Sequence, residues 1–170
     1  LIDQRHPADH LTAYSDALVA ALMQSGVTLQ VQYFEESPDA GCWRVCSSLN
    51  GLERMRVTSF SDIASRFTGH RLLVFSEAQA LIDEMSGLPQ NWTQHLRAFP
   101  QRAWFSPMPL ASWGEAERAA DSHGFLVLPL QPESLNTMAA WFSSGQLGLE
   151  VGIDWPLNYP HILRGEEVAW

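Results

Sequence analysis

Segments typical of buried strands alternate with segments typical of helices along most of this chain. The clearest strand is RLLVFS at 71–76, a nearly continuous apolar run of the kind found in strands covered on both faces. Shorter apolar runs follow at 102–109 and 125–130, and a helix-like segment separates them. Because parallel strands need a crossover of about a dozen residues, the alternation predicts a doubly wound α/β fold with a mostly parallel sheet and helices on both faces.

The helices are predicted from the spacing of apolar side chains and from the residues at their ends. Residues 10–25 repeat apolar positions every three or four residues and end before Gly26. Ser61 is predicted to cap one helix, and Ser112 to cap another that closes at Gly124. Other predicted elements are helical segments at 78–85, 92–99 and 132–145, a strand at 27–34, and a loop at 35–50 with a short edge strand around CWRV.

Length and composition predict one domain in residues 1–145, followed by a tail or linker at 146–170. The chain has 170 residues, of which 46% are hydrophobic, enough for one sizeable core. Leu1, Ile2 and Asp3 resemble the end of a strand whose beginning is missing, so we expect an N-terminally truncated domain from a larger bacterial protein.

Charge and hydropathy argue against two classes of partner. The net charge is −9, and the ten basic residues are scattered rather than clustered, so we expect no nucleic-acid binding. No apolar run approaches the roughly 18 residues of a membrane span.

Cys42 and Cys46 have neither the redox C-x-x-C spacing nor a second pair to complete a zinc site, which favours reduced thiols and a cytoplasmic protein.

In open α/β sheets, ligands bind beyond the carboxyl ends of the strands, near the point where the strand order reverses. The sequence contains no G-x-G-x-x-G or G-x-x-x-x-G-K loop for phosphates and no G-x-S-x-G nucleophile motif. The polar candidates at these ends include Ser106 after a later strand and five residues that we predict to form a binding rim: Asp3, Arg5, Thr58, Ser76 and Glu77.

Two short segments resemble the von Willebrand factor A domain. LID at 1–3, followed by a helix containing AYSDALVAAL, is similar to the strand and helix around that family's D-x-S-x-S metal loop. LLVFSEAQ at 72–79 is similar to its second signature strand, and the order of elements over 1–145 agrees. The resemblance implies a Rossmann-like α/β fold and a role in protein binding.

The resemblance also implies a metal-ion-dependent adhesion site, built from an Asp and two hydroxyls of one loop, a Thr of a second and an Asp of a third. Asp3 matches the first position, but Arg5 and Pro7 stand where the two serines belong. Thr58 matches the Thr, and Ser76 or Glu77 the last carboxylate. Mg²⁺ requires oxygen ligands, whereas Arg5 brings its own cation, so we predict that the site is degenerate and that no metal or other cofactor is needed.

The function that these features predict is a noncatalytic protein–protein interaction module of a larger intracellular multidomain protein. Its partner would be another protein or a neighbouring domain of the same chain, and its binding rim would contain Asp3, Arg5, Thr58, Ser76 and Glu77. The alternative is a nucleotide-binding sensor or an enzyme on a Rossmann-like sheet without standard motifs.

Seven tryptophans support the prediction of an interaction role. Trp104 and Trp141 lie on apolar faces and are expected in the core. The others fall in loops or at the ends of elements, where exposed aromatic side chains often mark protein contacts: Trp43, Trp92, Trp113, Trp155 and Trp170.

Overall fold

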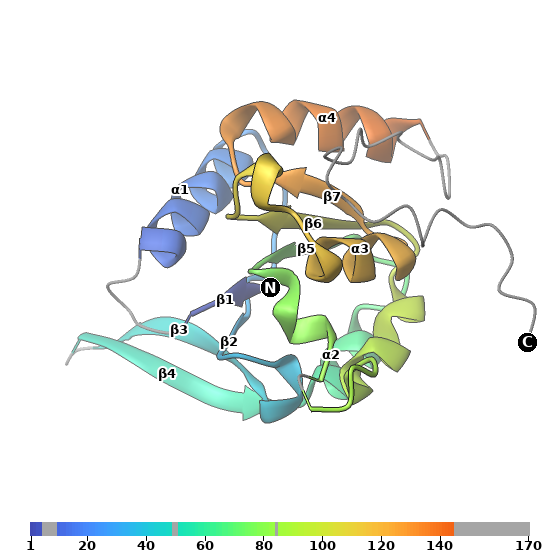
Figure 1. Ribbon diagram of the computed structural model, residues 1–170. Coiled ribbons are helices and arrows are strands. Elements are labelled where there is room, and N and C mark those ends of the chain that lie inside the picture. The colour runs from blue at the N-terminus through green and yellow to red at the C-terminus, as the bar shows by residue number, and fades with distance from the viewer. Residues whose placement is uncertain (5–9, 49–50, 84, 145–170) are drawn as a thin grey trace, which may run out of the picture.

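A computed structural model describes residues 1–4, 10–48, 51–83 and 85–144, which form a seven-stranded mixed sheet with helices (Figure 1). The strands are β1 (Ile2–Asp3), β2 (Tyr33–Phe34), β3 (Cys42–Ser48), β4 (Gly51–Thr58), β5 (Leu72–Phe75), β6 (Arg102–Ser106) and β7 (Leu126–Pro129). The α-helices are α1 (His10–Gln24), α2 (Phe60–Arg66), α3 (Glu115–Ser122) and α4 (Pro132–Ser143). Four 3-10 helices complete the described elements: η1 (Pro38–Ala40), η2 (Ala78–Leu81), η3 (Asn91–Ala98) and η4 (Leu110–Ser112).

The strand order is β4-β3-β2-β1-β5-β6-β7, which places the first strand of the chain in the middle of the sheet. β1, β2, β5, β6 and β7 run parallel to one another, whereas β3 is antiparallel to both of its neighbours. The chain goes from β1 outward on one side and then returns to the centre at β5. The strand order therefore reverses between β1 and β5, the position where α/β sheets form ligand sites.

The buried side chains form two hydrophobic clusters, and neighbouring residues of one strand alternate between them. Val74 belongs to the first cluster and Phe75 to the second, while Trp104 lies in the first and Phe105 in the second. Such alternation is expected because successive side chains of a strand point to opposite faces of a sheet. Helices α2 and α3 contribute to the first cluster, and α1 and α4 to the second; Figure 1 shows α1 and α4 together at the top of the view.

Strands β3 and β4 form a long hairpin that extends away from the other elements (Figure 1). The short edge strand predicted around CWRV is therefore confirmed as the first part of β3, but the prediction of a loop was wrong for the rest of that strand, which continues to Ser48.

The predicted N-terminal caps of two helices were each wrong by two residues. α2 is capped by Ser59 rather than Ser61, because the Ser59 hydroxyl accepts a hydrogen bond from the Asp62 amide at 3.1 Å. α3 begins after Gly114 rather than Ser112, which lies at the end of η4.

The helical segment predicted at 78–85 is limited to the short 3-10 helix η2. It ends where the Asp83 carboxylate accepts hydrogen bonds from the amides of Met85 and Ser86, at 3.2 and 2.8 Å. An aspartate that binds following backbone amides favours a turn over a continued helix. The segment predicted at 92–99 is also a 3-10 helix, and the predicted tail at 146–170 lies outside the described residues.

Candidate functional site

Asp3 and Ser76 meet at the point where the strand order reverses. Asp3 ends β1 and Ser76 follows β5, and the Ser76 hydroxyl donates a hydrogen bond of 3.0 Å to Oδ2 of Asp3. The two side chains are 2% and 0% exposed. The structure thus brings together two residues of the predicted rim and places both inside the protein rather than on its surface.

Trp104 of β6 contacts the backbone of Ser76. Its indole nitrogen donates a hydrogen bond of 2.7 Å to the Ser76 carbonyl oxygen, and its ring packs edge to face on Phe125 with centroids 5.1 Å apart. The Ser76 amide in turn donates to the Phe105 carbonyl at 3.3 Å. The side chain, carbonyl oxygen and amide of Ser76 are therefore all bound to described protein groups at the point where the strand order reverses.

A second buried polar cluster lies at the end of the neighbouring strand β6. The Ser106 hydroxyl donates to Oε1 of Glu117 at 2.8 Å, and the Gly114 amide donates to Oε2 at 2.9 Å. The Met108 amide completes the cluster by donating to the Ser106 hydroxyl at 3.2 Å. Glu117 thus closes the N-terminus of α3 and ties it to the sheet.

Sequence reasoning noted Ser106 at a strand end but missed its partner Glu117. The available signal was the position of Glu117, three residues after the Gly114 cap, where a glutamate commonly accepts from the capping residue. This cluster has an architectural role, because both oxygens of the carboxylate are engaged and the side chain is buried.

Thr58 does not lie near Asp3. It ends β4 and pairs with Cys42 of β3, and β2 separates β3 from β1. Three strand spacings of about 4.8 Å each put the two backbones on the order of 14 Å apart. Arg5 and Pro7 lie outside the described residues.

The described residues do not fit the adhesion-type metal site. One oxygen of Asp3 accepts a hydrogen bond from Ser76, and Thr58 is three strands away, whereas Mg²⁺ needs its oxygen ligands at about 2.1 Å. Within the described part of the chain, no group of three or more His, Cys, Asp and Glu side chains is suited to hold a metal ion.

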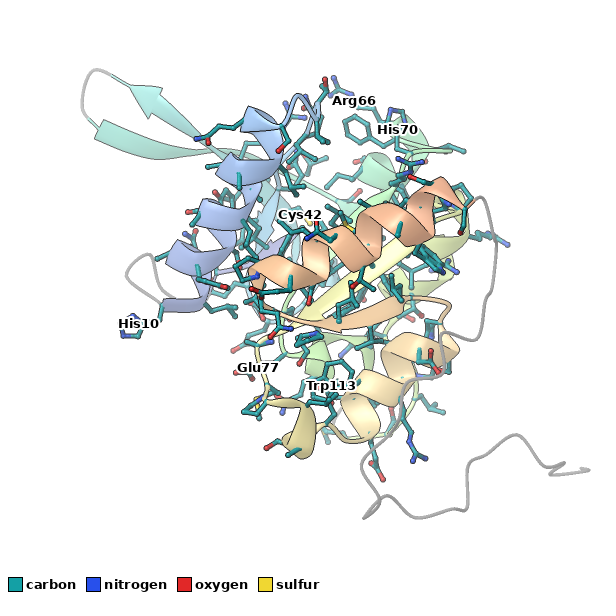
Figure 2. All side chains as sticks on the ribbon, turned by 90° about the horizontal axis from the view of Figure 1, so that it is seen from above. His10, Cys42, Arg66, His70, Glu77 and Trp113 are labelled. Carbon is teal, nitrogen blue, oxygen red and sulfur yellow. The ribbon has the colours of Figure 1, made fainter. Side chains whose placement is uncertain are left out.

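Glu77 begins η2 directly after Ser76 and is half-buried. Figure 2 shows it at the same end of the molecule as Trp113, whose indole nitrogen donates to the Met108 carbonyl at 3.0 Å. This contact anchors the loop after β6, in which Met108 and Leu110 expose large parts of their side chains. Among the described residues at this end of the sheet, the polar pair Asp3 and Ser76 is therefore buried, and the loop after β6 exposes apolar side chains.

Three tryptophans expected in loops or at the ends of elements are buried: Trp43, Trp92 and Trp113. These three are therefore not exposed anchors for a protein partner, and Trp155 and Trp170 lie outside the described residues. Trp104 and Trp141 are buried as expected.

Cys42 is a free, buried thiol at the start of β3. Burial raises its pKa to about 11, so the sulfur stays protonated at neutral pH. Since the thiolate is the reactive form, this cysteine is not a nucleophile at that pH.

Comparisons with known proteins give no family assignment. No model of a known protein family matches the chain, and neither curated proteins nor solved structures show significant similarity to it. Among the described residues, no helix is both long and apolar enough to cross a membrane.

Proposed function

We propose that this domain is a noncatalytic protein-binding module of a larger cytoplasmic protein, doubly wound with helices on both faces and related in architecture to von Willebrand factor A domains. The observation that carries the proposal is the internal bonding of Ser76: its hydroxyl binds Asp3 and its carbonyl oxygen binds Trp104, at the strand ends where α/β sheets form ligand sites. Because these groups bind one another inside the protein, we expect the partner protein to bind the surface loops around them.

The loop after β6 is the best candidate for the contact surface. Met108 and Leu110 expose apolar side chains there, and Glu77 lies at the start of the connection after β5, the strand beside β6. Apolar side chains beside a charged one are typical of the centre and rim of a protein interface. The buried Trp113 fixes the loop's backbone through Met108, which reduces the conformational entropy lost on binding.

Replacing Leu110 by Asp is expected to abolish partner capture without unfolding the domain. Leu110 is 47% exposed, so the substitution leaves the core intact but places a charge in the apolar part of the interface. Immobilised wild-type and variant proteins are incubated with extract of the source organism, and captured proteins are quantified by mass spectrometry. A specific partner should be depleted at least about tenfold by Leu110→Asp, a change of about 1.4 kcal/mol or more.

Val27→Asp is the matched control, because Val27 is 44% exposed but follows the C-terminus of α1, away from the loop after β6. It should capture the partner as the wild type does. Equal capture by the wild type and both variants would contradict the proposed surface.

Magnesium is expected to leave the thermal stability of the domain unchanged. A ligand that binds only the folded state raises the melting temperature, so the absence of a site predicts a shift under about 1 °C on adding about 10 mM MgCl2 in place of EDTA. Differential scanning fluorimetry measures this directly. A rise of several degrees that Asp3→Asn removes would show that the metal site is functional and that the degenerate-site interpretation is wrong.

A further inference from the structure

A pocket of about 400 Å³ lies between α2 and the strands β2 to β4, away from the strand-end site. Its lining includes Arg44 of β3, Thr58 of β4, and Asp62, Arg66 and Phe67 of α2 and its C-terminal end. Figure 2 shows Arg66 at the opposite end of the molecule from Glu77, so this pocket and the proposed protein-binding loop are separate. A volume of this size suits a small molecule.

The register of the strands explains how polar groups come to line this pocket. Tyr33 pairs with Trp43, so the preceding residue Gln32 lies opposite Arg44 on the antiparallel neighbour. Gln32 shares a sheet face with Phe34, two residues on, and Phe34 packs in the same cluster as the α2 residue Ile63. Gln32 and Arg44 therefore form one wall of the pocket and α2 forms another.

The two arginines of the pocket are held by neutral groups. With the Gln32 amide oriented so that its oxygen faces Arg44, that oxygen accepts from Nε and Nη2 of the guanidinium at 2.5 and 3.2 Å. The Arg66 guanidinium carbon lies 5.4 Å from the centroid of the Phe67 ring. Neither contact neutralises the positive charge.

The described residues of the pocket lining carry a net positive charge in an acidic protein. Arg44 and Arg66 contribute two positive charges and Asp62 one negative charge, giving +1 for these residues, whereas the whole chain carries −9. Among the residues that the structure describes, no carboxylate lies within ion-pair distance of either guanidinium. A guanidinium presents donors in a planar fork that matches the oxygens of a carboxylate or phosphate.

We propose that this pocket binds a small organic anion, with its carboxylate or phosphate oxygens held by Arg44 and Arg66 and an aromatic or apolar portion against Phe67. The Thr58 hydroxyl supplies a further donor to the anion. The proposal is independent of the protein-binding loop, because it uses none of the same residues.

Isothermal titration calorimetry with phenyl phosphate, benzoate and inorganic phosphate tests the pocket. Phenyl phosphate or benzoate should bind saturably and more tightly than inorganic phosphate, since only the organic probes contact Phe67. Arg66→Gln should weaken binding at least about tenfold, because the exposed guanidinium is lost while α2 keeps its fold. Asp62→Asn should tighten binding severalfold by removing the one acid among the described lining residues.

Arg97→Gln is the matched control, because Arg97 is an exposed arginine of η3 that does not line the pocket. It removes the same charge from the protein and should leave the affinity unchanged. The proposal is overturned if Arg66→Gln and Arg97→Gln bind the probes equally well. Absence of saturable binding by both organic probes up to about 10 mM would also overturn it.

Discussion

Replacing Trp104 by Ala is expected to lower the free energy of unfolding by about 4 to 6 kcal/mol. Truncating a buried aromatic side chain costs about 3 to 5 kcal/mol through lost burial and the cavity left behind. Trp104 is completely buried and packs against Trp92 and Phe125. The substitution also leaves the Ser76 carbonyl without the indole donor at 2.7 Å, which adds about 1 kcal/mol or more.

Urea denaturation followed by circular dichroism measures this loss, and two further variants separate its causes. Trp104→Phe keeps most of the ring contacts but removes the indole donor, so it should cost about 2 kcal/mol and stay folded. Leu88→Ala, at a residue that is 64% exposed, should change stability by less than about 0.5 kcal/mol. A loss under about 2 kcal/mol for Trp104→Ala would show that the sheet centre is not packed around this ring.

Glu117→Ala is expected to cost about 3 kcal/mol of stability. The variant loses two charge-assisted hydrogen bonds and leaves the Ser106 hydroxyl and the Gly114 amide without this acceptor. A hydrogen bond to a charged group contributes about 1.5 to 3 kcal/mol, and both donors lie at a junction between α3 and β6.

The helix offers its own controls for this experiment. Glu117→Gln keeps the length of the side chain and one acceptor oxygen, so its loss should be intermediate. Glu115→Ala removes an exposed acid from the first turn of the same helix and should cost at most about 1 kcal/mol. Equal losses for Glu115→Ala and Glu117→Ala in urea denaturation would contradict the role of the buried carboxylate in joining α3 to the sheet.

Local sequence signals predicted the elements that depend on local interactions. α1 ends as expected at Gly26, where the backbone turns to φ +85° and its amide donates to the Met23 carbonyl. Pro132 occupies the first turn of α4, where its missing amide hydrogen costs nothing. The apolar runs at β5, β6 and β7 form three neighbouring parallel strands of the sheet.

Tertiary contacts decided the features that local signals missed. Trp92 looked like a loop residue, but its indole donates to the Ala80 carbonyl at 2.8 Å and its amide donates to an Asp39 oxygen at 3.2 Å. Three segments far apart in the chain thus bury one side chain. No pattern within a short window of sequence encodes such a contact.

The candidate site was predictable only in its central part. Asp3 and Ser76 follow neighbouring parallel strands, so strand-end reasoning brought them together correctly. Thr58 was placed in the same rim because its strand was not recognised as the outer arm of a hairpin. Two intervening strands, β2 and β3, separate it from Asp3.

The position of β4 at the margin of the sheet has a consequence for self-association. An outermost strand offers its free backbone groups to other chains, and natural proteins discourage such growth with charged residues. The sequence of β4, GLERMRVT, carries Glu53, Arg54 and Arg56 among its eight residues. Within the described part of the chain, β4 is therefore an outermost strand whose sequence carries charges of the kind that discourage fibril-like stacking of one molecule on the next.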